Sequence, residues 1–313
     1  IDLAIKKYGG EREDWIDLST GINGTSYPWQ ESVKVELRNL PSNKILMNLE
    51  KAAARAYKIA ESTYTAAASG AQQIINLLPI CLKNYNSVTI LGPTYNEYEK
   101  AFKSSGFKTQ TVSEVSKLSS SDIAIIVNPN NPTGKVIADE TLEDLSKKVR
   151  ILIIDESFKM FSSRKTLNLS NIIQINSLGK FFGLAGLRLG FVSGPSDFIK
   201  AVREMLGPWP VSSLAAEIGI VALNDGVWIS EMEKILVTES NALHEACSSR
   251  NWELVGRTSL FHTYATSSCL EVEKQFAAHG IWVRTFDYSE TWVRLGIPTS
   301  EHVWERVKQA LNQ

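Results

Sequence analysis

Short runs of apolar, mostly β-branched residues recur through the middle of the chain. Runs that are apolar at nearly every position are typical of strands buried on both faces of a largely parallel sheet. Helical patterns lie between them, as at residues 139–149, where Leu142 and Leu145 share a face. This alternation over residues 62–224 predicts a layered α/β unit. The predicted strands are residues 87–91, 123–127, 151–154 and 172–175.

The pattern changes after Gly226. Residues 227–250 read as one long helix, and shorter elements of both kinds follow it. We expect a smaller α+β domain here, packed with residues 1–40, which lack the parallel-sheet pattern. The predicted domains are therefore 41–224 for the large one, and 1–40 with 225–313 for the small one. The shorter elements are strands at 260–264, 281–284 and 292–295, and helices at 271–278 and from Ser300.

The composition excludes several classes of protein. The 33 basic and 34 acidic residues give a formal net charge of −1, so we expect no nucleic-acid partner. No stretch approaches the roughly 18–20 apolar residues of a membrane helix, and no secretory signal is visible. The three cysteines are widely separated, which favours a reducing cytoplasm over a disulfide framework. The four histidines form no pair at ligand spacing, so we expect no metal.

The first candidate for chemistry is the sequence NPNNPTG at residues 128–134, directly after the predicted strand that ends at Val127. Asn, Pro and Gly are common in tight turns, and a simple turn is one interpretation. The other is a rigid loop at the carboxyl end of a strand, where open α/β sheets place their ligands. There, Asn131 could donate a hydrogen bond to a phenolic oxygen.

The second candidate is Asp155, which opens the sequence DESF after the apolar run 151–154. Polar residues often simply end a buried strand. A carboxylate so close to the buried layer nevertheless needs a partner, and a protonated pyridine nitrogen would be one.

The third candidate is Lys180, within SLGKFFGLAGLRLGF at residues 177–191. Most lysines are solvated, but this one lies among apolar residues and glycines. Desolvation lowers the pKa of a lysine and makes its neutral amine available for Schiff-base chemistry. The Gly134-Lys135 and Gly179-Lys180 pairs do not indicate a P-loop, because neither is followed by Ser or Thr and neither has the required upstream glycine.

These three motifs follow one another at even spacing, with Asn131 and Asp155 24 positions apart and Asp155 and Lys180 25 apart. Together they make the chain resemble the class I and II aminotransferases, especially the branch with histidinol-phosphate aminotransferase and threonine-phosphate decarboxylase. The resemblance implies an α/β fold of the pyridoxal 5′-phosphate (PLP)-dependent fold type I. This fold has a mostly parallel central sheet in a large domain, plus a small α+β domain. It also implies a homodimer.

The resemblance also implies residue roles for the cofactor. Lys180 would hold PLP as a Schiff base, Asp155 would pair with the pyridine nitrogen, and Asn131 would bond the phenolic oxygen. Tyr95 would stack on the ring, although a half-buried core aromatic is an alternative. The implied phosphate ligands are Ser177 and Arg188, with the turn of Gly70, Ala71 and Gln72, which by itself could be only a helix cap.

Three residues are candidates for the substrate. Arg294, in the strand WVRL, matches the arginine that binds the substrate α-carboxylate in the family, and a planar guanidinium suits that group. Arg284 is an alternative for which a surface role is as reasonable. Asn23 is a further candidate, although a turn beside Gly21 and Gly24 also explains it.

The cofactor ligands are shared by decarboxylases and aminotransferases, so the flanking segments must decide between them. The segment DLSTGIN at residues 17–23 and GPWPVS at 207–212 resemble the threonine-phosphate decarboxylases of cobalamin biosynthesis. We therefore expect decarboxylation of L-threonine O-3-phosphate to (R)-1-amino-2-propanol O-2-phosphate. The alternatives are a histidinol-phosphate aminotransferase or a relative, and a PLP-fold binding or regulatory protein without turnover. Intact Asn131, Asp155, Lys180 and Arg188 disfavour the last.

Overall fold

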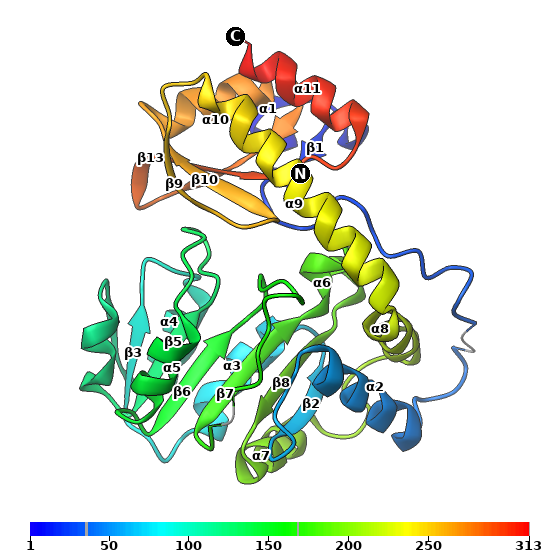
Figure 1. Ribbon diagram of the computed structural model, residues 1–313, viewed down its shortest axis with the longest axis vertical. Helices are drawn as coiled ribbons and strands as arrows, with labels where there is room; N and C mark the ends of the chain where they lie inside the picture. Colours follow the sequence, from blue (N-terminus) through cyan, green and yellow to red (C-terminus); the bar gives the residue numbers. More distant parts are fainter. Residues whose placement is uncertain (35–36, 168, 313) are drawn as a thin grey trace.

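A computed structural model describes residues 1–34, 37–167 and 169–312. Its largest element is a seven-stranded sheet, the lower layer in Figure 1. The strands are β2 (Tyr64–Ala68), β3 (Ser87–Leu91), β4 (Lys108–Val112), β5 (Ile123–Val127), β6 (Ile151–Asp155), β7 (Ile172–Ser177) and β8 (Gly190–Gly194). They lie in the order β2-β8-β7-β6-β5-β3-β4, with β7, β6, β5, β3 and β4 parallel and with β8 antiparallel to both β7 and β2.

Helices cover both faces of this sheet, which explains why its central strands are apolar throughout. In β5, Ile123 and Ile125 pack into one core cluster, and Ala124 and Ile126 pack into another on the opposite face, as alternation along a strand requires. The helical elements are α2 (Asn43–Ala56), α3 (Ala71–Cys81), α4 (Glu97–Ser104), η2 (Val115–Ser120), α5 (Asp139–Ser146), α6 (Leu178–Phe181), η3 (Ala185–Leu187), α7 (Ser196–Leu206) and α8 (Ser213–Asn224).

The four strands predicted for this region are all present. The helix predicted over residues 139–149 is shorter, because Lys147 caps it and the chain then turns so that Val149 is buried ahead of β6. The strands β2, β4 and β8 were not predicted. The strand β4, with the sequence KTQTV, lies at the edge of the sheet and is mostly exposed; β2 and β8 differ from the predicted strands in composition. Their sequences YTAAA and GFVSG are rich in small residues, which have low β-propensity.

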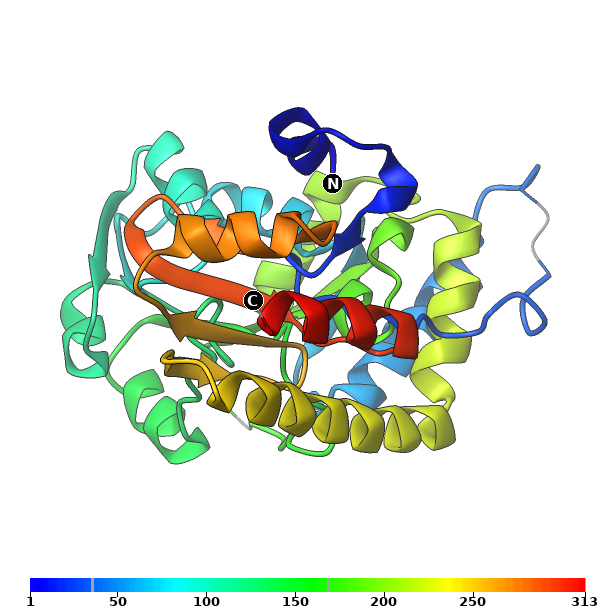
Figure 2. The same cartoon turned by 90° about the horizontal axis from the view of Figure 1, so that it is seen from above.

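A second, four-stranded sheet lies above the first in Figure 1. It is antiparallel, in the order β12-β13-β10-β9. The predicted run 281–284 is divided between β11 (Ile281–Trp282), which lies outside this sheet, and β12 (Arg284–Phe286), an edge strand of it. Figure 2 shows the helices α9, α10 and α11 lying side by side over this part of the molecule. The elements are α9 (Gly226–Ser248), β9 (Glu253–Arg257), β10 (Phe261–Ala265), α10 (Cys269–Ala277), β11 (Ile281–Trp282), β12 (Arg284–Phe286), β13 (Ser289–Gly296) and α11 (Glu301–Leu311).

The N-terminal residues pack against this second sheet and its helices. They form α1 (Asp2–Tyr8), η1 (Arg12–Asp14) and β1 (Ile16–Asp17), and β1 pairs in parallel with β11. The buried Glu273 carboxylate of α10 accepts hydrogen bonds from Lys7, from the Tyr8 hydroxyl at 2.6 Å and from the Thr285 hydroxyl at 3.2 Å. The predicted domain boundaries stay a prediction.

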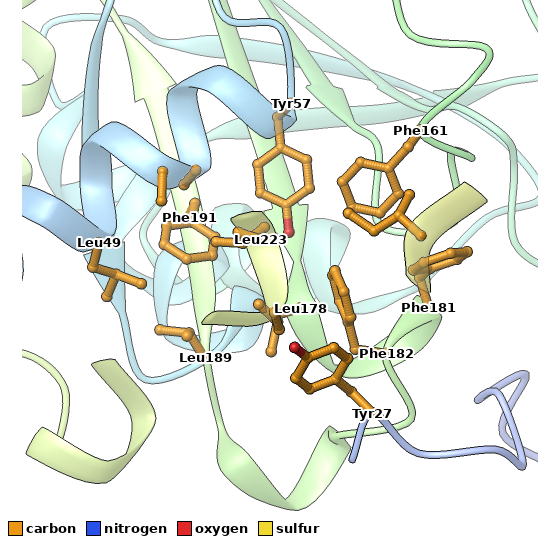
Figure 3. Packing of buried hydrophobic residues seen from close by; sticks show 14 of the residues in the cluster. Tyr27, Leu49, Tyr57, Phe161, Leu178, Phe181, Phe182, Leu189, Phe191 and Leu223 are labelled. Atoms are coloured by element: carbon orange, nitrogen blue, oxygen red, sulfur yellow. The ribbon is translucent and has the colours of Figure 1, made fainter. Parts of the chain in front are cut away.

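Residues 18–27, called the strap below, cross from the small sheet to the large one. At one end, the Leu18 amide donates to the Trp282 carbonyl, and at the other the Tyr27 amide donates to the Phe182 carbonyl at 2.9 Å. Tyr27 and Phe182 belong to the buried hydrophobic cluster shown in Figure 3, to which Leu178 and Phe181 of α6 also contribute. The strap is therefore fixed at both ends and spans the space between the two sheets.

No helix in the described part of the chain has the length and apolar character needed to cross a bilayer.

Candidate active site

A pocket of about 470 Å³ lies between the carboxyl ends of the parallel strands and the small sheet. Open α/β sheets place ligands at this edge. The pocket brings together most of the predicted site residues, namely Ala71, Gln72, Tyr95, Asn131, Asp155, Ser177, Lys180, Arg188, Arg284 and Arg294.

Asp155 is the last residue of β6, beside Val127 in the register of the sheet. Its side chain is only 4% exposed. One carboxylate oxygen accepts a hydrogen bond from the Tyr98 hydroxyl at 2.7 Å, and the other accepts one from the Ser157 amide at 2.9 Å. Burial raises the pKa of this carboxyl group, and the two hydrogen bonds oppose that rise. The site therefore holds a buried carboxylate that still needs a cationic partner.

Lys180 lies in α6, the short helix that follows β7 directly. Its ammonium group donates to the Thr20 carbonyl of the strap at 3.2 Å and lies 5.3 Å from the centre of the Phe158 ring. Burial, helped by the Arg294 cation and opposed by Asp155, lowers the pKa of Lys180 to about 8. A useful fraction of this amine is therefore neutral and nucleophilic near neutral pH.

The turn before α3 forms a cradle that only glycines permit. Gly70 has φ of 89°, and a Cβ at this position would lie 2.7 Å from an Arg188 guanidinium nitrogen. A Cβ on Gly190 would lie 2.5 Å from the Ala71 amide nitrogen. These close approaches bring the start of α3 and the Arg188 side chain together, which is a suitable arrangement for an anion such as phosphate.

Tyr95 stands at the open side of the pocket, where 38% of its surface is exposed. Its hydroxyl donates to the Gln72 side-chain oxygen at 2.9 Å. The pKa of Tyr95 is raised, first by burial and then by the Glu97 carboxylate. The Tyr95 hydroxyl therefore ties this side chain to α3, and the ring is not buried in the core.

Arg294 reaches the pocket from the small sheet and is 6% exposed. Its guanidinium donates to the Asn131 side-chain oxygen and to the Ser19 carbonyl of the strap. Among the described residues its Nε has no hydrogen-bond partner. Burial and the nearby Arg284 lower the pKa of Arg294 to about 10. This buried cation is suited to an anionic ligand group.

Arg294 is buried and lines the pocket, whereas three other predicted residues are either exposed or outside the lining. Arg284 lines the pocket but is exposed, with its guanidinium 5.7 Å from the Phe286 ring. Gly70 supports the pocket without lining it. Asn23 also lies outside the lining, because its buried amide donates to the Phe181 carbonyl and accepts from the Thr25 amide.

Sequence reasoning missed three groups at this site. The Ser19 and Thr20 carbonyls face the two cations, but every residue has a carbonyl, so no residue type could have indicated them. Tyr98 bonds Asp155 from one turn beyond Tyr95. Tyr98 follows Tyr95 by three positions, but a tyrosine on the buried face of a helix is equally typical of the core, so no sequence signal distinguished it.

These groups fit PLP on the geometry alone. The glycine cradle with Arg188 suits its phosphate, the amine of Lys180 suits its aldehyde, and the buried Asp155 suits its ring nitrogen. Asn131 accepts from Arg294 through its oxygen, which leaves its amide nitrogen to donate to a phenolic oxygen.

Comparisons with known proteins agree with this geometry. A family model described as aminotransferase class I and II matches residues 14–311. A threonine-phosphate decarboxylase of Sinorhizobium sp is 32% identical, over 99% of this chain and 96% of the relative. Another from Pseudomonas aeruginosa is 32% identical, over 98% and 94%. The solved histidinol-phosphate aminotransferase from Sinorhizobium meliloti in complex with pyridoxal-5'-phosphate has a TM-score of 0.82 at 13% identity, covering 99% of this chain and 92% of its own. The predicted fold is confirmed.

Proposed function

The chain belongs to the aminotransferase class I and II family, and on that premise we propose that it is a PLP-dependent decarboxylase of L-threonine O-3-phosphate. The product is (R)-1-amino-2-propanol O-2-phosphate, an intermediate of cobalamin biosynthesis. The observation that carries the proposal is the 32% identity to two threonine-phosphate decarboxylases over nearly the whole of all three chains.

The side chains from the large sheet have roles toward the cofactor. Lys180 supplies the amine that bonds the cofactor's aldehyde carbon, and Asp155 pairs with the ring nitrogen. The cradle at Ala71 and Gln72, with Ser177 and Arg188, holds the phosphate, while Tyr95 faces the ring. When bound, PLP supplies an electron sink for the pair of electrons left at the substrate Cα.

The remaining side chains act on the substrate. Arg294 orients an anionic group of the amino acid, and the bond at Cα held perpendicular to the ring is the one that breaks. For decarboxylation this is the bond to the carboxylate carbon. Once CO₂ has left, a proton must be added at Cα, and Lys180 can deliver it because its pKa of about 8 lies near neutral pH.

A histidinol-phosphate aminotransferase is the second candidate. Its support is that both reactions use the same cofactor ligands; the solved enzyme from Sinorhizobium meliloti, at 13% identity, shares the fold. In that reaction the C–H bond at Cα would be the one that breaks, because histidinol phosphate carries no carboxylate on this carbon.

The test is a product assay on PLP-loaded protein with L-threonine O-3-phosphate and no keto acid. We expect CO₂ and aminopropanol phosphate in equal amounts. Amino transfer from histidinol phosphate to 2-oxoglutarate, without CO₂ release, would assign the chain to the second candidate. No turnover of either substrate would favour a binding protein.

We also propose that the protein acts as a homodimer in the cytoplasm, without nucleic acid. The support for the dimer is a set of exposed apolar side chains around two packed helices. Leu37 and Leu40 precede α2, Met47 lies in it, and Trp209 lies in the loop before α8, which packs against α2. Exposed apolar side chains of this size are typical of protein interfaces.

A further inference from the structure

Tyr98 is a fully buried tyrosine whose hydroxyl contacts the Asp155 carboxylate of the site. It has 0% exposure and lies in α4, within the apolar cluster between α3, α4 and the large sheet. Its hydroxyl is 2.7 Å from one oxygen of Asp155. A tyrosine needed only for packing could be replaced by phenylalanine, so the placement of this hydroxyl calls for an explanation in terms of Asp155.

The contact fixes the orientation of the Asp155 carboxylate. One oxygen accepts from Tyr98 and the other from the Ser157 amide at 2.9 Å. Each oxygen of a carboxylate can accept about two hydrogen bonds, so both retain a lone pair for a ligand. With two donors in place the carboxylate cannot rotate freely, and its remaining acceptor sites face the pocket that Asp155 lines.

The charged and titratable groups near Asp155 come from several elements. Lys180 reaches it from α6 and Tyr95 from the loop before α4, while Tyr98 comes from α4 itself. The adjacent Glu156 points to the other face of the sheet, where Arg164 bonds it at 2.9 Å. Tyr98 is thus the nearest neutral donor, and no cation of the described chain forms a salt bridge with Asp155 within 4.0 Å.

The energetic balance at Asp155 depends on its donors. Burial raises the pKa of the carboxyl group, and the Ser157 and Tyr98 hydrogen bonds lower it. The pKa of the Tyr98 phenol is itself far above its usual value because of burial and the nearby Asp155, so the phenol remains a donor throughout the accessible pH range. Loss of this donor would therefore favour the neutral form of Asp155.

We propose that Tyr98 is a positioning residue that keeps Asp155 ionised and directed at the ring nitrogen of PLP. The inference rests on the proposed cofactor but not on the choice of reaction, because both candidate reactions need a protonated ring nitrogen. Tyr98 does not itself touch the cofactor; it acts through Asp155.

The test is the pH dependence of PLP binding to Tyr98→Phe apoprotein, followed by cofactor absorbance. The Tyr98 hydroxyl bonds a charged group, and loss of such a bond raises the pKa of the carboxyl group it stabilised. On the measured pH axis, loss of one hydrogen bond of this kind corresponds to about 1–2 pH units. PLP affinity depends on the ionised carboxylate, so the acid limb of the affinity profile should move to higher pH by about that amount. A profile that superimposes on that of the wild type would overturn the proposal.

Tyr57→Phe is the matched control. Tyr57 is also buried, at 2% exposure, and its hydroxyl has no hydrogen-bond partner among the described residues. Removal of this hydroxyl should leave the acid limb in place. An equal shift in both variants would assign the effect to general loosening of the core and contradict the proposal.

Two further measurements distinguish an effect through Asp155 from a folding defect in the Tyr98→Phe variant. In the Asp155→Asn background, Tyr98→Phe should cause no further change in PLP affinity, whereas an additive loss would refute action through Asp155. Replacement of Tyr98 by 3-fluorotyrosine preserves its shape but makes the phenol a stronger donor. The acid limb should then move to lower pH, and a shift to higher pH would contradict the proposal. Decarboxylation is not a readout in any of these experiments, so failure of the proposed reaction remains distinguishable.

Discussion

The two sides of the pocket differ in the signs of the charged side chains that they bring together. On the large-sheet side, Asp155 ends the strand β6 and Lys180 lies just after the neighbouring parallel strand β7, and the two carry opposite charges. On the small-sheet side, Arg284 and Arg294 are direct partners on adjacent antiparallel strands and carry the same charge. Like charges directly opposite one another destabilise a sheet.

This difference indicates which charge a ligand must supply on each side of the pocket. The large-sheet side carries charges of both signs, but Asp155 forms no salt bridge among the described residues, so a protonated ring nitrogen would complete it and a phosphate would pair with Arg188. The small-sheet side has two cations and, from the strap, only neutral carbonyls. An anionic substrate would relieve that repulsion, so we expect the small sheet to bind substrate more than cofactor.

Lys180→Ala should have the largest effect. Among the described residues that line the pocket, Lys180 supplies the only amine, so turnover should fall by more than about 10³-fold. CO₂ release and cofactor absorbance measure the loss. The exposed Lys135, in the loop after Asn131, provides the control, and Lys135→Ala should retain turnover. Near-normal turnover in Lys180→Ala would remove the basis for the whole assignment.

Arg294→Gln tests the small-sheet side and should have an intermediate effect. The loss of charge-assisted hydrogen bonds to an anionic substrate should raise KM about 10- to 100-fold, with little change in PLP affinity. Arg284→Gln should raise KM less, because an exposed cation contributes less than a buried one. Steady-state kinetics and PLP titration separate the two sides. A loss of PLP affinity in Arg294→Gln would break the division between cofactor and substrate sides.

Gly256→Ala tests the contact between the two sides and should have the smallest effect. A Cβ on Gly256 would lie 1.9 Å from the Thr133 carbonyl oxygen, so the small sheet must move away from the loop that carries Asn131. We expect a stability loss of about 1–3 kcal/mol and a few-fold rise in KM. Gly226→Ala is the control, because its Cβ would meet nothing within 4 Å. Equal melting temperatures for both variants would show that the contact tolerates displacement.

The sequence predicted the central strands well because their residues are buried on both faces, which leaves a continuous apolar run. In the large sheet it missed β4, an edge strand that is mostly exposed, and it missed β2 and β8. There, small residues are required, since any side chain on Gly190 would meet the backbone before α3. The packing that builds the phosphate cradle thus removes the β-branched residues by which a strand is recognised.

For the site, the sequence indicated residues whose type is unusual for their surroundings. Asp155 and Lys180 stand out because a charge follows an apolar run. Tyr98 does not, because a tyrosine on the buried face of an amphipathic helix reads as core. Asn23 was predicted as a substrate contact, but its amide holds the strap to α6, and only the tertiary structure could show that its partner is a backbone carbonyl.

The strap also affects when the pocket can be completed during protein synthesis. The Ser19 carbonyl and its partner Arg294 are 275 positions apart in the chain. At a translation rate of about 5–20 residues per second, Ser19 is synthesised roughly 14–55 seconds before Arg294. During that time Lys180 and the phosphate cradle can already form, while the anion-binding side is missing. A nascent chain could therefore capture its cofactor well before it is able to recognise a substrate.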